Sequence, residues 1–282
     1  MGYYLILGSG AFHALWNLWA KASRDRVVFL WSFQMIAVAT YYPWAWMALT
    51  THGVSIIGWE MLLGTAALHG IYVLLLVRTY SLGDLSEVYP LMRGVSPLAV
   101  PLIGVMCMGE HLTWLGWGGI VLVVCGIGVV GGVTDPRSFF KLPRATLASA
   151  IAVGVVITGY TIWDKLTLRY VPAVTLNDVG NLANFLVLSG PALRVGRRAI
   201  TREWRANWSR IGLAGVISPG AYLLFLLALQ RLPLAQVAPM REVGTVFGTV
   251  LGVWVLREAY GARRIVGAGL IALGVLLLGV FG

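Results

Sequence analysis

Ten long apolar runs, each near the length of a membrane-spanning helix, make up most of this 282-residue chain. A helix needs about 20 apolar residues to cross the hydrocarbon core of a bilayer. Hydrophobic residues form 59% of the chain and charged residues 11%, which leaves too little polar surface for a water-soluble particle. Runs this long predict helices, because a helix satisfies its own backbone hydrogen bonds in lipid. The expected spans are Tyr3–Ala20, Val27–Leu49, Ile57–Val77, Leu85–Met108, Leu112–Val133, Ala145–Leu166, Ala173–Leu193, Ile211–Leu229, Ala235–Leu256 and Ala262–Phe281.

The positive charge of the chain, formally +10, falls mostly in short loops between the apolar runs. Lipid headgroups and topology explain this distribution better than nucleic acid, because the sequence shows no zinc-finger spacing and no long basic tract. The loops on one side hold only Lys165, Arg169 and Arg231, so the positive-inside rule predicts an inner-membrane protein with both termini outside the cytoplasm. The most basic loop, Arg194–Arg210, also holds two tryptophans and is expected to contact anionic headgroups. We expect no cleavable signal peptide at the start of the sequence.

The second half of the chain repeats the first at an offset near 148 residues. Arg93 matches Arg241 and Glu110 matches Glu258 in the fourth and ninth runs, and glycines recur in the fifth and tenth. We expect a structural role, such as capping a neighbouring helix, for the two glutamates at the ends of their runs. Several matches in the same order predict duplication of a five-span unit.

The repeat predicts the domain organisation. Residues 1–134 form the first five-span unit, 144–282 form the second, and 135–143 link them. Because five is odd, the second unit is expected to be inverted relative to the first. Inverted repeats are a common transporter plan, which places the binding site at the repeat interface near the bilayer midplane.

Two motifs resemble a known family. Ser86-Glu-Val-Tyr-Pro-Leu-Met-Arg93 is followed by Met108-Gly-Glu110, and Ala235-Gln-Val-Ala-Pro-Met-Arg241 is followed by Leu256-Arg-Glu258. With ten spans and the duplication, they make the whole chain resemble the drug/metabolite transporter superfamily, and within it the EamA-type ten-helix transporters. The opening Phe12-His-Ala-Leu-Trp-Asn-Leu-Trp-Ala-Lys21 is similar to a subgroup associated with phosphonate utilisation.

The resemblance implies an all-α membrane protein with two inverted five-helix repeats around a central cavity. The first, third, fourth, sixth, eighth and ninth helices would line the cavity, and the fifth and tenth would support it. His69, Tyr72 and Tyr222 are cavity candidates mainly because they lie on helices that the family uses as lining.

Arg93 and Arg241 are the buried charges that most need an explanation. A charge near the bilayer centre costs about 2.5–3.5 kcal/mol on insertion scales, so such residues face a cavity or a partner. The pair could bind a carboxylate or phosphonate in bidentate geometry. Alternatively, each could form an internal ion pair, with Glu87 or Glu242. Tyr89 shares a helix face with Arg93 and is a further binding candidate.

Equivalent polar and aromatic clusters stand in the first and sixth spans. Each cluster has i, i+3, i+4 spacing and therefore lies on one helix face. Facing each other, the clusters could form an amphipathic cage with cation–π character, although tryptophans near span ends also suit an interfacial belt. The clusters are His13, Trp16 and Asn17, and Tyr160, Trp163 and Asp164.

These features predict a secondary transporter of a small zwitterion, namely an amino acid, an aminophosphonate or a related amine. No P-loop motif suggests ATP as the energy source, and we expect no cofactor and no metal. An exporter of lipophilic or quaternary cations is the alternative. A membrane enzyme on lipid-linked substrates is a weaker one, because no catalytic constellation is recognisable. The oligomeric state, monomer or homodimer, stays open. The proton-coupling candidates are Glu87, Asp164, Asp178 and Glu242.

Overall fold

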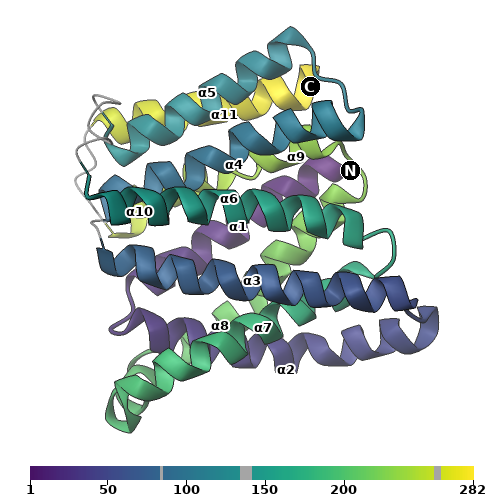
Figure 1. The fold of residues 1–282 in the computed structure, drawn as a ribbon. Coiled ribbons are helices and arrows are strands. Elements are labelled where there is room, and N and C mark those ends of the chain that lie inside the picture. Colours follow the sequence, from purple (N-terminus) through teal and green to yellow (C-terminus); the bar gives the residue numbers. More distant parts are fainter. Residues whose placement is uncertain (83–84, 134–141, 257–261) are drawn as a thin grey trace.

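Helices form nearly all of the structure, as the apolar runs predict (Figure 1). The computed structural model describes residues 1–82, 85–133, 142–256 and 262–282, except for the side chains of 80–81, 85–89 and 253–256. Within those ranges there is no strand. The helices are α1 (Gly2–Lys21), α2 (Arg26–His52), α3 (Ile56–Leu82), α4 (Leu85–Met108), α5 (Trp114–Gly131), α6 (Arg144–Thr167), α7 (Ala173–Val195), α8 (Arg197–Leu229), α9 (Leu234–Met240), α10 (Val243–Leu256) and α11 (Ala262–Phe281).

Each predicted span coincides with a helix, except that the ninth is divided into α9 and α10. The segment Arg194–Arg210, expected as a loop, is mostly helical, because α8 already begins at Arg197. Among the described helices, α3, α4, α5, α6, α8 and α11 are long and apolar enough to cross a membrane by length and composition. Helices α1, α2 and α7 have at least 20 residues each, which reaches the length of a span at about 1.5 Å per residue. The fold is therefore an all-helical membrane bundle.

The division of the ninth span falls at Arg241 and Glu242. The N–H of Glu242 donates to the carbonyl of Pro239, and that of Thr245 to the carbonyl of Glu242, at 3.1 and 2.9 Å. These three-residue bonds form a tight turn in place of the four-residue ladder of an α-helix. Pro239 has no N–H to give to that ladder. The turn places two consecutive charged residues inside the bundle.

Glycines let α5 and α11 pack along their length at the edge of the bundle (Figure 1). A Cβ atom on Gly126 would lie 2.7 Å from the carbonyl oxygen of Gly267, and one on Gly119 would lie 2.8 Å from that of Gly274. Such backbone contact is possible only without side chains. Gly119 precedes Gly126, whereas Gly274 follows Gly267, so the two helices run antiparallel.

The remaining helices pack against one another between the two halves of the chain. Helix α1 contacts α8 and α10, while α6 contacts α3 and α4. Helix α2 contacts α7 and α8, and α3 contacts α7. The largest hydrophobic cluster is built mainly from α5, α8, α9 and α11, and it includes Phe225, Leu229 and Ile271 as fully buried side chains.

Glu110 caps the start of α9, as the sequence predicts for a structural glutamate. Its two carboxylate oxygens accept the N–H groups of Leu234 and Ala235, each at 2.7 Å. The first N–H groups of a helix have no partner within the helix, and a carboxylate there also interacts favourably with the helix dipole. Lys165 donates to the carbonyls of Leu229 and Leu232 on the other side of the same turn. Glu258 lies outside the described residues.

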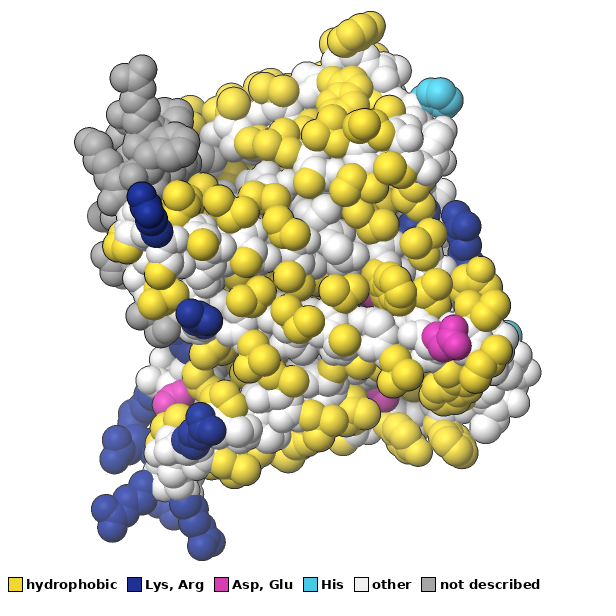
Figure 2. Space-filling model, viewed as in Figure 1, with side chains coloured by type: hydrophobic (Ala, Val, Ile, Leu, Met, Phe, Trp, Pro, Cys, Tyr) yellow, Lys and Arg dark blue, Asp and Glu magenta, His cyan; other side chains and the backbone are white. Residues whose placement is uncertain are grey.

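The basic end of the bundle is organised by the first turns of α8. Figure 2 shows Lys and Arg gathered at the end where α7 meets α8, away from the termini marked in Figure 1. Asn207 has non-helical torsions and kinks α8. The buried carboxylate of Glu203 accepts hydrogen bonds from the N–H groups of Arg24 and Asp25 at 3.1 and 3.0 Å. This contact ties the α1–α2 turn to α8.

Candidate functional site

Arg93 of α4 lies between residues from two distant parts of the chain. One of its terminal nitrogens is 2.8 Å from Nε2 of His13 in α1, and the other is 3.6 Å from the Glu242 carboxylate. The hydroxyl of Thr245 donates to Glu242 at 3.2 Å. Glu242 is 4% exposed, so the ion pair is held away from bulk water. The pair expected between Arg93 and Glu87 or Glu242 therefore forms with Glu242 among the described side chains.

Arg241 makes a different set of contacts. Its guanidinium carbon lies 4.4 Å from the ring centre of Phe225 and 5.1 Å from that of Tyr222, both in α8. Contacts of this kind stabilise a cation by about 0.5–2 kcal/mol. Its Nε atom is buried and has no hydrogen-bond partner among the described residues. A buried donor without an acceptor costs about 1–3 kcal/mol, and a ligand could supply that acceptor.

Both arginines line the same small pocket, which opens between α4, α6, α8 and the α9–α10 turn. The space has room for about one water molecule, so a solute of amino-acid size does not fit without movement of the walls. The lining residues are Arg93, Ser96, Ile157, Thr161, Phe225, Ala238, Arg241 and Glu242.

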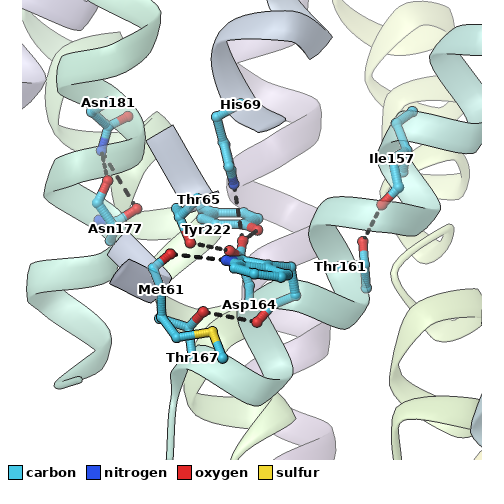
Figure 3. Close-up of polar contacts among 11 residues, drawn as sticks. Met61, Thr65, His69, Ile157, Thr161, Asp164, Thr167, Asn177, Asn181 and Tyr222 are labelled. Atoms are coloured by element: carbon cyan, nitrogen blue, oxygen red, sulfur yellow. Dashed lines mark hydrogen bonds and ion pairs between the residues drawn. The ribbon is translucent and has the colours of Figure 1, made fainter. Parts of the chain in front are cut away.

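A second polar cluster surrounds Asp164 of α6 (Figure 3). Thr65 donates to one carboxylate oxygen at 2.9 Å. His69 Nε2 and the Tyr222 hydroxyl contact the other oxygen at 2.9 and 2.5 Å. Asp164 has no exposed surface and His69 has 6%. The carboxylate is therefore held by three groups, two from α3 and one from α8.

Aromatic rings enclose this second cluster. The Tyr160 ring lies 4.6 Å from the His69 ring and 5.5 Å from the Tyr72 ring, centre to centre. Tyr222 belongs to both sites, because its hydroxyl reaches Asp164 while its ring lies under Arg241. The two sites form one continuous unit within the bundle.

Three residues expected at the cavity lie elsewhere. Trp16 packs edge-on against His13 and near Phe33 of α2, in a hydrophobic cluster with α8. Asn17 is exposed and donates to the carbonyl of His13 in its own helix. The Trp163 indole donates to the Met61 carbonyl at 2.8 Å. Helical spacing predicted that the three residues of each cluster share one helix face. Each face contacts two neighbouring elements, however, so its residues do not all reach the cavity.

The other predicted residues divide as follows. Glu87 and Tyr89 fall on side chains outside the described residues. Asp178 is buried in α7 with one carboxylate oxygen unpaired among the described residues. Its neighbour Asn177 donates to the Pro219 carbonyl of α8 at 3.2 Å, so this side chain of α7 faces protein.

Sequence reasoning missed several contributors, among them Thr65, Ser96, Thr161 and Phe225. Thr65 stands four residues before His69 and thus shares its helix face, which is a usable signal. The spacing of Ser96, three residues after Arg93, is a similar signal. Phe225 is an ordinary apolar residue in an apolar run, and nothing in the sequence distinguishes it.

Comparison with known proteins agrees with this architecture. A model of the EamA-like transporter family matches residues 145–280. The uncharacterized transporter YojE of Bacillus subtilis is 22% identical over 273 residues, which cover 90% of this chain and 84% of YojE. The probable 4-amino-4-deoxy-L-arabinose-phosphoundecaprenol flippase subunit ArnE of Enterobacter sp. is 32% identical over 94 residues, 33% of this chain and 88% of ArnE.

A further ArnE relative, from Hamiltonella defensa, is 29% identical over 100 residues, covering 34% of this chain and 90% of that protein. A crystal structure that shares 16% identity has the same fold, with a TM-score of 0.75 over 98% of this chain and 96% of the other. The chain belongs to the EamA-like transporter family, within the drug/metabolite transporter superfamily, and is a multi-pass membrane transporter of that type.

Proposed function

We propose that the chain is a secondary transporter that carries a small zwitterion across the inner membrane by alternating access. The proposal rests on the pocket in which the buried Nε of Arg241, without a partner among the described residues, lies beside the Arg93–Glu242 ion pair. A guanidinium matches a carboxylate or phosphonate in bidentate geometry. Glu242 is the matching acceptor for an ammonium group.

The charges of the pocket favour a zwitterion over a simple cation. A carboxylate, phosphonate or phosphate would pair with Arg241, while an amine would exchange for Arg93 at Glu242. Amino acids, aminophosphonates and related amines have this chemistry. The ArnE relatives are named as subunits of a flippase for a lipid-linked amino sugar phosphate, which also joins an amine to an acid.

The alternative substrate, a lipophilic or quaternary cation, would use the aromatic rings around Asp164. Tyr72, Tyr160 and Tyr222 supply aromatic faces near that carboxylate. However, Thr65, His69 and Tyr222 already contact the Asp164 carboxylate, so a cation would have to displace them. The zwitterion therefore remains the better candidate. We propose no enzymatic activity, since the family is one of transporters.

The packing supports two inverted repeats, residues 1–134 and 144–282. If α1 corresponds to α6, α3 to α8 and α4 to the divided ninth span, the contact of α1 with α8 has its counterpart in that of α6 with α3. Helices α5 and α11 would be equivalent and meet on the pseudo-two-fold axis. Their antiparallel direction is the one that inversion requires.

Alternating access would open this pocket to each side in turn. Its small volume fits an occluded state, from which the α9–α10 turn and the proline-containing α4 would move. The orientation we propose has both termini outside and the Arg194–Arg210 segment on anionic cytoplasmic headgroups. The protein would work as a monomer or homodimer, driven by a solute or proton gradient.

Binding and flux with purified protein test the proposal. The probes are L-alanine, 2-aminoethylphosphonate, choline and inorganic phosphate, first by thermal shift and then by uptake into proteoliposomes. We expect a zwitterionic probe to raise the Tm and to be transported. Arg241→Gln should weaken its binding about ten- to hundredfold, since a charge-assisted hydrogen bond contributes about 1.5–3 kcal/mol.

Arg231→Gln is the matched control, because Arg231 is exposed and stands outside the pocket. It should leave binding and uptake unchanged. Binding of choline without any zwitterion would favour the cation alternative. Unchanged uptake of a zwitterion in both Arg241→Gln and Arg93→Gln would reject the pocket as the substrate site.

A further inference from the structure

A carboxylate and an imidazole meet in the interior of the bundle, outside the group that lines the pocket. Asp164 and His69 are 2.9 Å apart, and neither is more than 6% exposed. Histidine is the side chain whose charge changes near neutral pH. A His–Asp pair held inside a membrane protein is the kind of group that forms a proton relay.

We propose that the His69–Asp164 pair is the proton-binding site of the transporter and that Tyr222 couples it to the substrate pocket. This inference rests on the proposed transport function, and it names the ion that drives it. One proton from the aqueous phase binds at the pair and leaves on the other side, and no covalent bond of the substrate is broken.

The position of Tyr222 carries the coupling. Its hydroxyl donates to the same Asp164 oxygen that His69 contacts, and its ring lies 5.1 Å from the Arg241 guanidinium carbon. A change in charge at Asp164 therefore alters the hydrogen bond of the tyrosine that supports Arg241.

Several neighbouring helices contribute groups around the pair. Helix α3 supplies His69 itself, α8 supplies Tyr222, and α6 supplies Tyr160. The charged residues of the adjoining pocket are Arg241 and Glu242 of the α9–α10 turn and Arg93 of α4, and of these Arg241 packs on the Tyr222 ring. Helix α7 brings Gly180 against the far edge of the imidazole. Lys165, next to Asp164 in sequence, is directed to carbonyls at the end of α8.

These charges give the direction of coupling. Arg93 pairs with Glu242, and the carboxylate of Asp164 is a counter-charge connected to Arg241 through Tyr222. A proton on the pair removes that counter-charge, so the pocket attracts the acidic end of the substrate more strongly. By reciprocity, a bound substrate raises the affinity for the proton. Proton and substrate thus travel together, as in symport.

The other acidic candidates are less suited to this role. Glu242 lies in the pocket and pairs with Arg93 and Thr245. Asp178 lies on α7, whose main contacts are with α2, α3 and α8 rather than with the α9–α10 turn. Among the acidic candidates whose side chains the structure describes, Asp164 is the one connected to the pocket through Tyr222 and Arg241 without being part of the lining, and the side chain of Glu87 lies outside the described residues.

The proton site is tested first without any substrate. Infrared difference spectra of purified protein between acidic and neutral pH report protonation of carboxylates and imidazoles. We expect a transition in the wild-type protein that is lost in Asp164→Asn and shifted in His69→Gln. It should persist in Glu60→Gln, a control at an exposed position on α3. Retention of the same transition in Asp164→Asn would overturn the proposal.

Coupling is tested second, in proteoliposomes with 2-aminoethylphosphonate or L-alanine. An inward proton gradient should stimulate wild-type uptake about tenfold, within the usual range of coupling. Asp164→Asn should lose the stimulation, and its cooperative thermal unfolding in detergent shows that the variant is folded. If Asp178→Asn loses the stimulation and Asp164→Asn keeps it, the assignment is wrong.

The two proposals fail separately. If the infrared transition depends on Asp164 but none of the probes is transported, the proton site stands and the substrate class is rejected. If a zwitterion is transported and depends on Arg241, yet no transition depends on Asp164, the transport function stands and the proton site is rejected.

Discussion

The carboxylate of Glu242 approaches the guanidinium of Arg93 to 3.6 Å, which is longer than a hydrogen bond but close enough for an ion pair. The two residues come from opposite halves of the chain, α4 and the turn between α9 and α10. His13 contacts the other terminal nitrogen of Arg93 at 2.8 Å. Because His13 holds Arg93 while the contact with Glu242 is long, a ligand can replace Arg93 at Glu242 at modest cost.

Glu242→Gln should distinguish binding of the substrate's amine from binding of its acidic group. The amide keeps the size of the side chain but removes the negative charge that would pair with an ammonium group. It also leaves the positive charge of Arg93 without its carboxylate partner. We expect the Kd of 2-aminoethylphosphonate to rise about ten- to hundredfold, while inorganic phosphate binds at least as well as before. Isothermal titration of both probes checks this, with Glu60→Gln as control. Equal weakening for both probes would contradict the assignment of the amine to Glu242.

The helices were predictable from sequence, but the division of the ninth span was not. Leu85–Met108 contains Pro90, Pro97 and Pro101 and still forms one helix, whereas the equivalent run with Pro239 breaks. A proline removes one ladder bond, and whether the helix then stops depends on what surrounds the freed groups. Those surroundings come from other helices, so the sequence of one run does not contain them.

The site was only partly predictable, because it too depends on how distant helices pack. The duplication identified Arg93 and Arg241 as equivalent buried charges, and both line the pocket. Trp16 and Trp163 were predicted from equally regular spacing, yet they pack against α2 and α3. Spacing states which residues share a face, but the direction of that face is set by packing between distant helices.

Glu110→Gln should destabilise the α8–α9 turn. The carboxylate accepts two N–H groups of α9 at 2.7 Å and meets the positive end of the helix dipole. An amide retains one acceptor and loses the charge, at a cost of about 1 kcal/mol, similar to the loss of a helix cap. Thermal unfolding in detergent should show a lower Tm, whereas exposed Glu60→Gln should not change it. An unchanged Tm in Glu110→Gln would show that the cap contributes nothing.

Gly126→Ala and Gly128→Ala should have opposite effects on stability. A Cβ atom at Gly126 would lie 2.6 Å from Cγ1 of Ile271 and 2.7 Å from the Gly267 carbonyl, so α5 and α11 must move apart. Overpacking of this kind costs about 1–3 kcal/mol. Gly128 has nothing within 4 Å of such an atom, and its replacement should gain up to about 1 kcal/mol of helix propensity. Paired Tm measurements check this, and equal shifts would mean that α5 and α11 do not meet there.

The orientation in the membrane can be tested at the two ends of the bundle. Thr201, in the basic first turns of α8, and Thr51, at the end of α2, are both exposed. In a background with Cys107 and Cys125 replaced by serine, Thr51→Cys should react with an impermeant maleimide in intact spheroplasts. Thr201→Cys should react only after permeabilisation, because the arginines around it are retained in the cytoplasm. The reverse labelling pattern would place the termini in the cytoplasm and would assign the basic segment to the wrong side.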